Sequence, residues 1–428
     1  MVSIHIFSHL STHNQQDIAH QRLKEMKKIG LFLESAPSGG GMFQYNQSLV
    51  GAVAALPSDR FTVVVAYTSE LWLEYLKDYR LHTVYVPHGA WGRAFSIALT
   101  VLGLPLRPWR KLCPLFYSTA QALIREQCDL WIFPSQNIIS NLVPVPALVS
   151  IHDLMHRYER RFPEACSLPQ YIGREHLFSN ICRWAQGILV DSETGRRHVI
   201  ESYGMEKGLI HVLPYIAPNY MRTGETLPDF NGRYRLPAKY IFYPAQFWEH
   251  KNHKHLIMAI AGLKHELSDL KLVLAGSKKN AFDVVVNLVN ERGLTDDVVF
   301  LGYVPDADMP ELYRRARALV MPTYYGPTNI PPLEAFTAGC PVAISGIYGM
   351  PEQVGDAALL FNPDSVDEIA DNIRALWTDD LLCSRLAAKG KELAAGWGEK
   401  QFNEQVEEIV DNIVFGRDSG NPDREEGM

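Results

Sequence analysis

The residues best suited to chemistry follow a short apolar run, Ala318–Met321, which predicts a buried strand. Pro331–Pro332 then predict the start of a helix, because proline is tolerated in a first helical turn. Three residues directly before that helix are expected to leave free amides at its positive end: Thr328, Asn329 and Ile330. Such an end favours anions. Glu334, about one turn further on, could hold a neutral group such as a ribose, so the spacing indicates a nucleotide diphosphate. A purely structural strand–loop–helix corner is the alternative.

These residues resemble the signature region of the family 4 retaining glycosyltransferases, which have the GT-B fold. The family pattern is a Glu, seven residues, a second Glu with Ala, and a Gly-x-Pro-Val strand entry. Glu334 and Gly339–Val342 match its second part, whereas Gly326 stands at the place of the first Glu. That first Glu commonly contacts the donor sugar in the family. The resemblance implies that Gly326 and Glu334 lie at the donor site, with Glu334 on the ribose.

A second segment, Tyr243–His253, follows the first predicted strand of the second half. It resembles the family segment in which an Arg and a later Lys hold the diphosphate. Lys251 matches the Lys, and Gln246 stands where Arg is usual. The resemblance therefore implies that Gln246 and Lys251 contact the donor. A solvated lysine at a helix start is the alternative.

Two further segments lie in the first half. Gly40 and Gly41 belong to a glycine-rich loop after the first predicted strand, where a backbone can approach a ligand closely. The loop resembles the one that faces the donor phosphate and the acceptor in the family. His152 ends another predicted strand at the place of a family His that contacts the donor sugar, and Asp153 could fix its ring. An ordinary mobile loop and a capping His are the alternatives.

Short apolar runs alternate with amphipathic helical stretches, which is typical of an α/β protein with parallel sheets. We expect two Rossmann-like, doubly wound domains facing a central cleft, and the resemblance adds a C-terminal helix that crosses back to the N-terminal domain. The expected parts are an extension (1–26), an N-terminal acceptor domain (27–216), a linker (217–237), a nucleotide-sugar domain (238–398), the crossing helix (399–415) and a disordered tail (416–428). The expected strands are 29–34, 61–67, 83–87, 130–133, 147–152, 187–190, 210–213, 240–243, 271–274, 298–301, 318–321, 341–344 and 358–361.

The composition is that of a soluble globular protein, with 47% hydrophobic and 21% charged residues in a chain of 428. The net charge of −7 argues against a general nucleic-acid binder. The six cysteines form no CxxC pair, which favours a reducing compartment. Because no signal segment and no apolar run of about 18 residues is seen, we expect a cytoplasmic protein.

Residues 93–111 form an apolar stretch with basic and aromatic flanks, which suits an interfacial helix on the inner face of the plasma membrane. A core helix is the alternative. Asp306–Asp308 matches the Asp-x-Asp of metal-dependent transferases, but its place before a predicted helix indicates a cap. Capping also accounts for Val190–Thr194. We therefore expect neither a metal nor a cofactor.

Taken together, the resemblance implies a retaining, metal-independent transferase of a hexose or deoxyhexose, with mannose favoured. The acceptor would be a glycan or lipid-linked glycan of bacterial O-antigen or capsule synthesis. His152, Lys251 and Glu334 would be the central side chains, with the departing phosphate taking the acceptor proton. A GT-B nucleotide-sugar 2-epimerase and an inactive sugar-nucleotide-binding subunit of an assembly complex are the alternatives.

Overall fold

The computed structural model describes residues 26–34, 40–86, 106–222 and 229–416. The predicted extension and tail lie outside these ranges except for Met26 and Gly416, as does most of the predicted interfacial segment 93–111. The described chain contains a seven-stranded sheet in its first half and a six-stranded sheet in its second half. The hydrogen-bonded strand pairs are parallel, as the apolar, β-branched runs predict.

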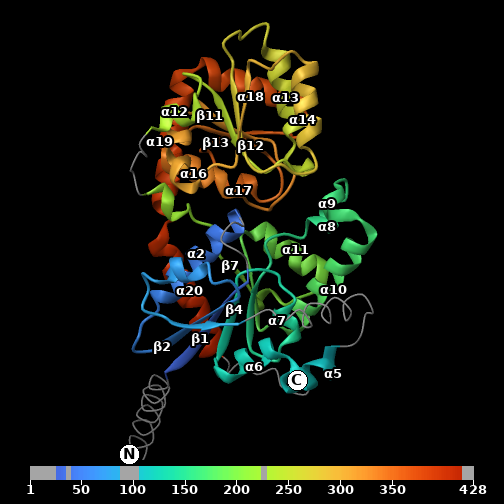
Figure 1. The fold of residues 1–428 in the computed structure, drawn as a ribbon, viewed down its shortest axis with the longest axis vertical. Helices are drawn as coiled ribbons and strands as arrows, with labels where there is room; N and C mark the ends of the chain where they lie inside the picture. Colours follow the sequence, from blue (N-terminus) through green and yellow to red (C-terminus); the bar gives the residue numbers. More distant parts are fainter. Residues whose placement is uncertain (1–25, 35–39, 87–105, 223–228, 417–428) are drawn as a thin grey trace, which may run out of the picture. The chain divides into compact units, whose positions relative to one another are not determined.

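The first sheet has the order β3-β2-β1-β4-β5-β6-β7 (Figure 1). Ile29 of β1 pairs with Val63 of β2 on one side and with Leu130 of β4 on the other. Its strands are β1 Lys27–Leu33, β2 Phe61–Tyr67, β3 His82–Tyr85, β4 Leu130–Phe133, β5 Ala147–Ser150, β6 Gly187–Val190 and β7 Ile210–Val212. The helices and 3₁₀ turns (η) of this half are α2 Gly41–Ala54, α3 Trp72–Leu76, α5 Leu106–Phe116, α6 Ser118–Arg125, α7 Ile139–Leu142, α8 Met155–Tyr158, α9 Pro163–Cys166, α10 Leu168–Trp184, α11 Glu193–Tyr203, η1 Lys207–Leu209 and η2 Asn219–Met221.

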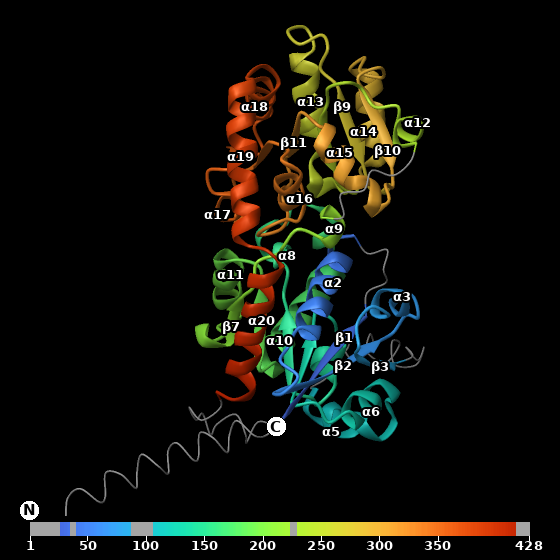
Figure 2. The same ribbon diagram turned by 90° about the vertical axis from the view of Figure 1, so that its left-hand side faces the viewer.

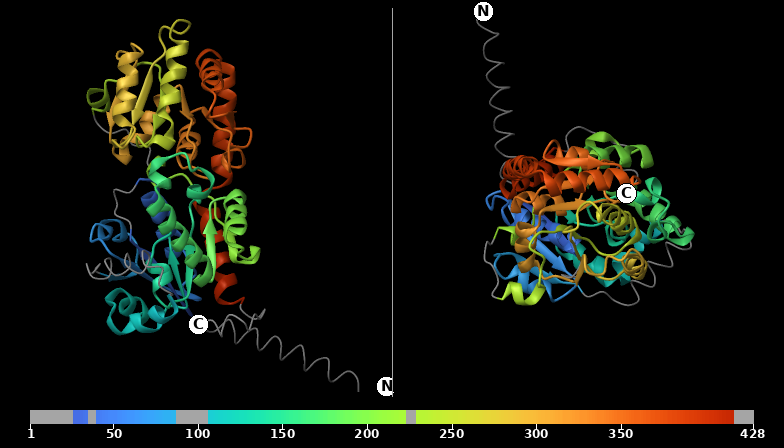
Figure 3. Two further views of the ribbon diagram at one scale, coloured as in Figure 1. Left: turned by 90° about the vertical axis from the view of Figure 1, so that its right-hand side faces the viewer. Right: turned by 90° about the horizontal axis from the view of Figure 1, so that it is seen from above.

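The second sheet has the order β10-β9-β8-β11-β12-β13. Its strands are β8 Ile241–Pro244, β9 Leu272–Ala275, β10 Val298–Gly302, β11 Ala318–Met321, β12 Val342–Ser345 and β13 Ala358–Phe361. Helices lie on both faces of the sheet (Figure 3). Helix α13 packs against α14 and α18, and α16 packs against α15 and α19. The helices and turns are α12 Phe230–Tyr234, η3 Glu249–Lys251, α13 His253–Leu263, α14 Phe282–Glu291, η4 Asp306–Asp308, α15 Met309–Arg315, α16 Pro331–Ala338, α17 Met350–Val354, α18 Val366–Thr378, α19 Asp380–Gly396 and α20 Glu399–Val414.

The predicted strands are confirmed: each of the thirteen is present, with ends shifted by at most two residues. Pro331 and Pro332 occupy the first positions of α16, also as predicted. The predicted architecture of two Rossmann-like domains is thus correct. The domain boundaries that we placed at residues 216 and 238 remain predictions.

The contacts divide the chain into two compact units, one of residues 1–149, 183–187 and 403–428, the other of 150–182 and 188–402. The terminal helix α20 runs back to the first unit, as its position beside β1 and β2 shows (Figures 1 and 2). Arg60 pairs with Glu407 and Asp411 of this helix, and Phe61 contacts Phe415 with ring centroids 5.9 Å apart. The crossing helix expected at the C-terminus is therefore confirmed.

Candidate functional site

Lys251 lies at the carboxyl end of β8, in the turn η3. Its Nζ is 3.4 Å from Asn329 Oδ1, and it makes no ion pair with any residue in the described part of the chain. Burial lowers the pKa of Lys251 to about 8, although the nearby Asp153 carboxylate opposes this change. A partly buried ammonium group without a carboxylate partner is suited to bind an anion that arrives from solution.

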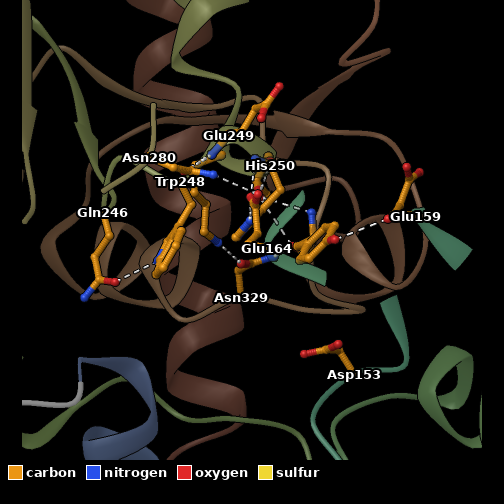
Figure 4. A network of polar contacts seen from close by, with 12 residues as sticks. Asp153, Glu159, Glu164, Gln246, Trp248, Glu249, His250, Asn280 and Asn329 are labelled. Carbon is orange, nitrogen blue, oxygen red and sulfur yellow. Dashed lines mark hydrogen bonds and ion pairs between the residues drawn. The ribbon is translucent and has the colours of Figure 1, made fainter. Parts of the chain in front are cut away.

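The residue before it, His250, is held by Glu164 of α9. Glu164 Oε1 accepts hydrogen bonds from the His250 backbone amide (3.0 Å) and from Nδ1 (2.5 Å), while Oε2 accepts one from Asn280 (3.0 Å). Figure 4 shows these three side chains meeting from separate segments. Burial opposes ionisation, but the hydrogen bonds hold the pKa of Glu164 at about 2. Because burial also lowers the pKa of His250 to about 4, the pair carries one negative charge near neutral pH.

Contacts made by residues 246–250 hold the turn η3 in place. The His250 ring stacks on Tyr325, with centroids 4.0 Å apart. Gln246 Oε1 accepts a hydrogen bond from Trp248 Nε1 at 2.9 Å (Figure 4). Gln246, at the place of the family Arg, therefore braces an aromatic side chain of this loop. The turn that carries Lys251 is therefore held by hydrogen bonds and a ring contact from several segments.

The loop before α16 differs from the prediction in its hydrogen bonding. The Thr328 amide donates to Asp191 Oδ2 (2.9 Å), and the Asn329 amide donates to Gln353 Oε1 (3.0 Å). The expectation that these two amides are free is therefore wrong, because side chains from other elements already accept from them. Burial raises the pKa of Asp191 to about 6 against the hydrogen bonds from Thr328 and Ser192.

Gly326 has φ of 91°, in the region that favours glycine. A Cβ atom here would lie 2.7 Å from the Thr328 carbonyl oxygen. The backbone at the place of the family's first Glu therefore needs glycine, and a Glu side chain would require a different loop path. Ile330 directly precedes α16.

Glu334 lies in the first turn of α16 and is buried. Its Oε2 accepts from Tyr313 at 2.5 Å, and its Oε1 accepts from Tyr220. Burial raises the pKa of Glu334, while the two hydroxyl donors act in the opposite direction. The sequence placed Glu334 near the site but gave no sign of these two tyrosines.

His152 Nδ1 lies 2.7 Å from Tyr215 Oη. Asp153 instead accepts from the Met155 amide at 3.0 Å, at the start of α8. Tyr215 therefore helps to orient the His152 ring. Gly40 and Gly41, at the start of α2, belong to the first compact unit, and their role at the donor site remains a prediction.

Asp308, the second Asp of the Asp-x-Asp triplet, occupies the N-cap position of α15, as predicted, but its side chain makes no capping hydrogen bond. Asp308 is buried and accepts two hydrogen bonds from Arg233 at 2.8 Å each. It also accepts one from Tyr234. Within the described ranges, no three His, Cys, Asp or Glu side chains gather in a group that could hold a metal ion.

Part of this chain matches a known protein family. Residues 230–393 match the family model described as Glycosyl transferases group 1, and this segment contains Gln246, Lys251 and Glu334. This segment is therefore similar to a group 1 glycosyltransferase domain. The match covers the second sheet and the two principal residues of the candidate site.

Sequence relatives have names of the same class. The chain is 37% identical over 182 residues to the O-antigen chain mannosyltransferase B of Escherichia coli, which covers 42% of this chain and 46% of that protein. It is 25% identical over 270 residues to a 2-deoxystreptamine glucosyltransferase of Streptomyces kanamyceticus, 60% of this chain and 68% of that one. The match thus spans less than half the length of the mannosyltransferase.

Solved structures share the fold over nearly the whole chain. Anabaena Alr3699/HepE in complex with UDP-glucose has a TM-score of 0.67 at 16% identity, covering 90% of this chain and 99% of that one. WaaG, a glycosyltransferase involved in lipopolysaccharide biosynthesis, has a TM-score of 0.63 at 16% identity, covering 91% and 100%. At these identities the likeness shows the fold, which is GT-B.

Proposed function

We propose that this chain is a retaining glycosyltransferase of family 4 that moves mannose, or another hexose or deoxyhexose, from a nucleotide-diphospho-sugar to a glycan or lipid-linked glycan. The observation that carries the proposal is Lys251: a partly buried lysine without an ion pair in the described chain, in the segment that matches group 1 glycosyltransferases. The partial match to an O-antigen mannosyltransferase supports mannose and surface polysaccharide synthesis.

In this proposal Lys251 stabilises the diphosphate as the bond to the sugar stretches and negative charge grows on the leaving group. Glu334 binds the nucleotide ribose, and His152, oriented by Tyr215, contacts the sugar. Because the Thr328 and Asn329 amides are already taken, Lys251 carries more of the stabilisation than the sequence suggested. The departing phosphate takes the acceptor proton, and no metal is needed.

The proposed location is the cytoplasm, with peripheral contact to the inner face of the membrane. None of the described helices is long and apolar enough to cross a bilayer. The described end of the predicted interfacial segment is α5, whose Arg107 and Lys111 are exposed. Leu112, Leu115 and Phe116 are also exposed on this helix. Exposed basic and large apolar side chains on one short helix support contact with an anionic surface.

The test is a transfer assay with the purified chain, GDP-mannose and other sugar nucleotides, and lipid-linked or free glycan acceptors, with EDTA present. We expect a glycosylated product whose anomeric configuration, measured by NMR, equals that of the donor. Inversion would contradict the retaining mechanism. Conversion of the sugar nucleotide without an acceptor would favour the 2-epimerase, and donor binding without turnover would favour the inactive subunit.

A further inference from the structure

The Glu334 carboxylate is held by two tyrosines that come from different elements. Tyr313 lies on α15 and is fully buried, and its hydroxyl donates to Oε2 at 2.5 Å. Tyr220 lies on the turn η2, between the two sheets in the sequence, and its hydroxyl donates to Oε1. Each carboxylate oxygen therefore has one tyrosine donor, which fixes both the position and the rotation of the group.

This arrangement leaves the carboxylate able to bind further donors. An ionised carboxylate has about four lone-pair directions, and two tyrosine hydroxyls use two of them. One acceptor direction remains on each oxygen, which suits a pair of neighbouring hydroxyls. Burial alone favours the protonated acid, and the two hydroxyl donors stabilise the ionised form. The tyrosines thus favour the form of Glu334 that can accept from a diol.

We propose that Tyr220 and Tyr313 are positioning residues that aim the Glu334 carboxyl group at the ribose hydroxyls of the nucleotide. The inference rests on the proposed function, because it takes Glu334 as the ribose ligand. Tyr220 is the more informative of the two, because it lies outside the predicted nucleotide domain, on the segment that precedes it. Through Tyr220 this segment takes part in recognition of the donor.

The test is a thermodynamic cycle that combines one substitution in the protein with the removal of the ribose hydroxyls from the ligand. Affinities of wild type and Tyr220→Phe are measured by calorimetry for GDP and UDP and for their 2′,3′-dideoxy forms. For the nucleotide that wild type binds, Tyr220→Phe should weaken binding of the ribose form by up to roughly tenfold, because a carboxylate that is no longer held on one side must be ordered when it binds the ribose. The same substitution should leave the dideoxy form unchanged, because that ligand makes no contact with Glu334.

Tyr234→Phe is the matched control, since its hydroxyl also donates to a buried carboxylate, that of Asp308, in the same unit. This control should bind both ligand forms as wild type does. Equal loss for the ribose and dideoxy forms in Tyr220→Phe would overturn the inference and assign Tyr220 a purely structural role. Tighter ribose binding would overturn it too, because Tyr220 would then compete with the ribose. Failure of wild type to bind any nucleotide would instead refute the proposed function.

Discussion

Replacement of Lys251 by Met should abolish donor binding and, at the same time, stabilise the fold. Lys251 has a pKa lowered from 10.5 to about 8 because burial disfavours its charged form. A gap of about 2.5 pH units corresponds to ~3 kcal/mol, at 1.36 kcal/mol per unit. This is the free energy that the folded state loses by holding a charged lysine in this place. Methionine has a similar length and no charge, so it removes the cost.

The stabilisation expected from Lys251→Met depends on pH, because the cost of the buried charge exists only while Lys251 is protonated. Below pH 8 the lysine is charged in both the folded and the unfolded chain, so the full cost is present. Between pH 8 and pH 10.5 the folded chain loses the proton first and the cost declines. Above pH 10.5 both states are neutral and the difference disappears. The gain from Lys251→Met should therefore be largest at pH 7 and fall steadily above pH 8.

Differential scanning calorimetry at several pH values measures this gain. For a unit of this size, ~3 kcal/mol corresponds to a midpoint of unfolding higher by roughly 6 °C at pH 7. Lys264→Met is the control, because Lys264 is paired with Asp297 at 2.7 Å and its replacement should not raise the midpoint. An unchanged or lower midpoint for Lys251→Met at pH 7 would refute the reasoning that Lys251 is kept for binding at the expense of stability.

Three further substitutions test other parts of the structure. Glu164→Ala should lower the free energy of unfolding by ~3 kcal/mol at pH 7, because the hydrogen bonds that the ionised Glu164 carboxylate accepts from His250 and Asn280 are lost. That loss should shrink as the pH falls from 4.5 towards 2, where Glu164 becomes protonated, and a constant loss in acid denaturation curves would contradict it. Gly326→Ala should cost ~1–3 kcal/mol in urea unfolding, because φ is 91° and the new Cβ meets the Thr328 carbonyl, whereas Gly346→Ala should be nearly neutral. Arg60→Ala should cost ~1 kcal/mol and speed hydrogen exchange in α20 through loss of the pairs to Glu407 and Asp411, and unaltered exchange would show that these pairs do not hold the helix.

The fold followed from the sequence because its signals are local. Each strand is a short apolar run, and Pro331–Pro332 mark the start of α16 wherever the rest of the chain lies. The ends of the strands do not follow from the same signal, since an apolar run such as 147–152 does not show where strand pairing stops. The structure ends β5 at Ser150, which leaves His152 and Asp153 in the following loop.

The sequence predicts a site residue only where a local pattern within one segment marks it. Lys251 and Glu334 stand in recognisable local patterns, whereas the Thr328 amide is taken by Asp191, which lies 137 positions earlier. The capping expected at Val190–Thr194 is confirmed for Ser192, whose Oγ accepts from the Gly195 amide, but local capping gave no sign of the contact made by Asp191. Tyr220, Tyr215 and Glu164 were missed for the same reason, because their partners are distant in the sequence.

The most direct test of the account is binding of sugar nucleotides to wild type and to Lys251→Met. Thermal midpoints are measured with GDP-, UDP-, dTDP- and ADP-sugars, each with and without EDTA, because a ligand that binds only the folded state raises the midpoint. We predict that one group of sugar nucleotides stabilises wild type, that EDTA does not alter the shift, and that Lys251→Met loses it. A flat panel for wild type, or a shift that survives in Lys251→Met, would contradict the central claim.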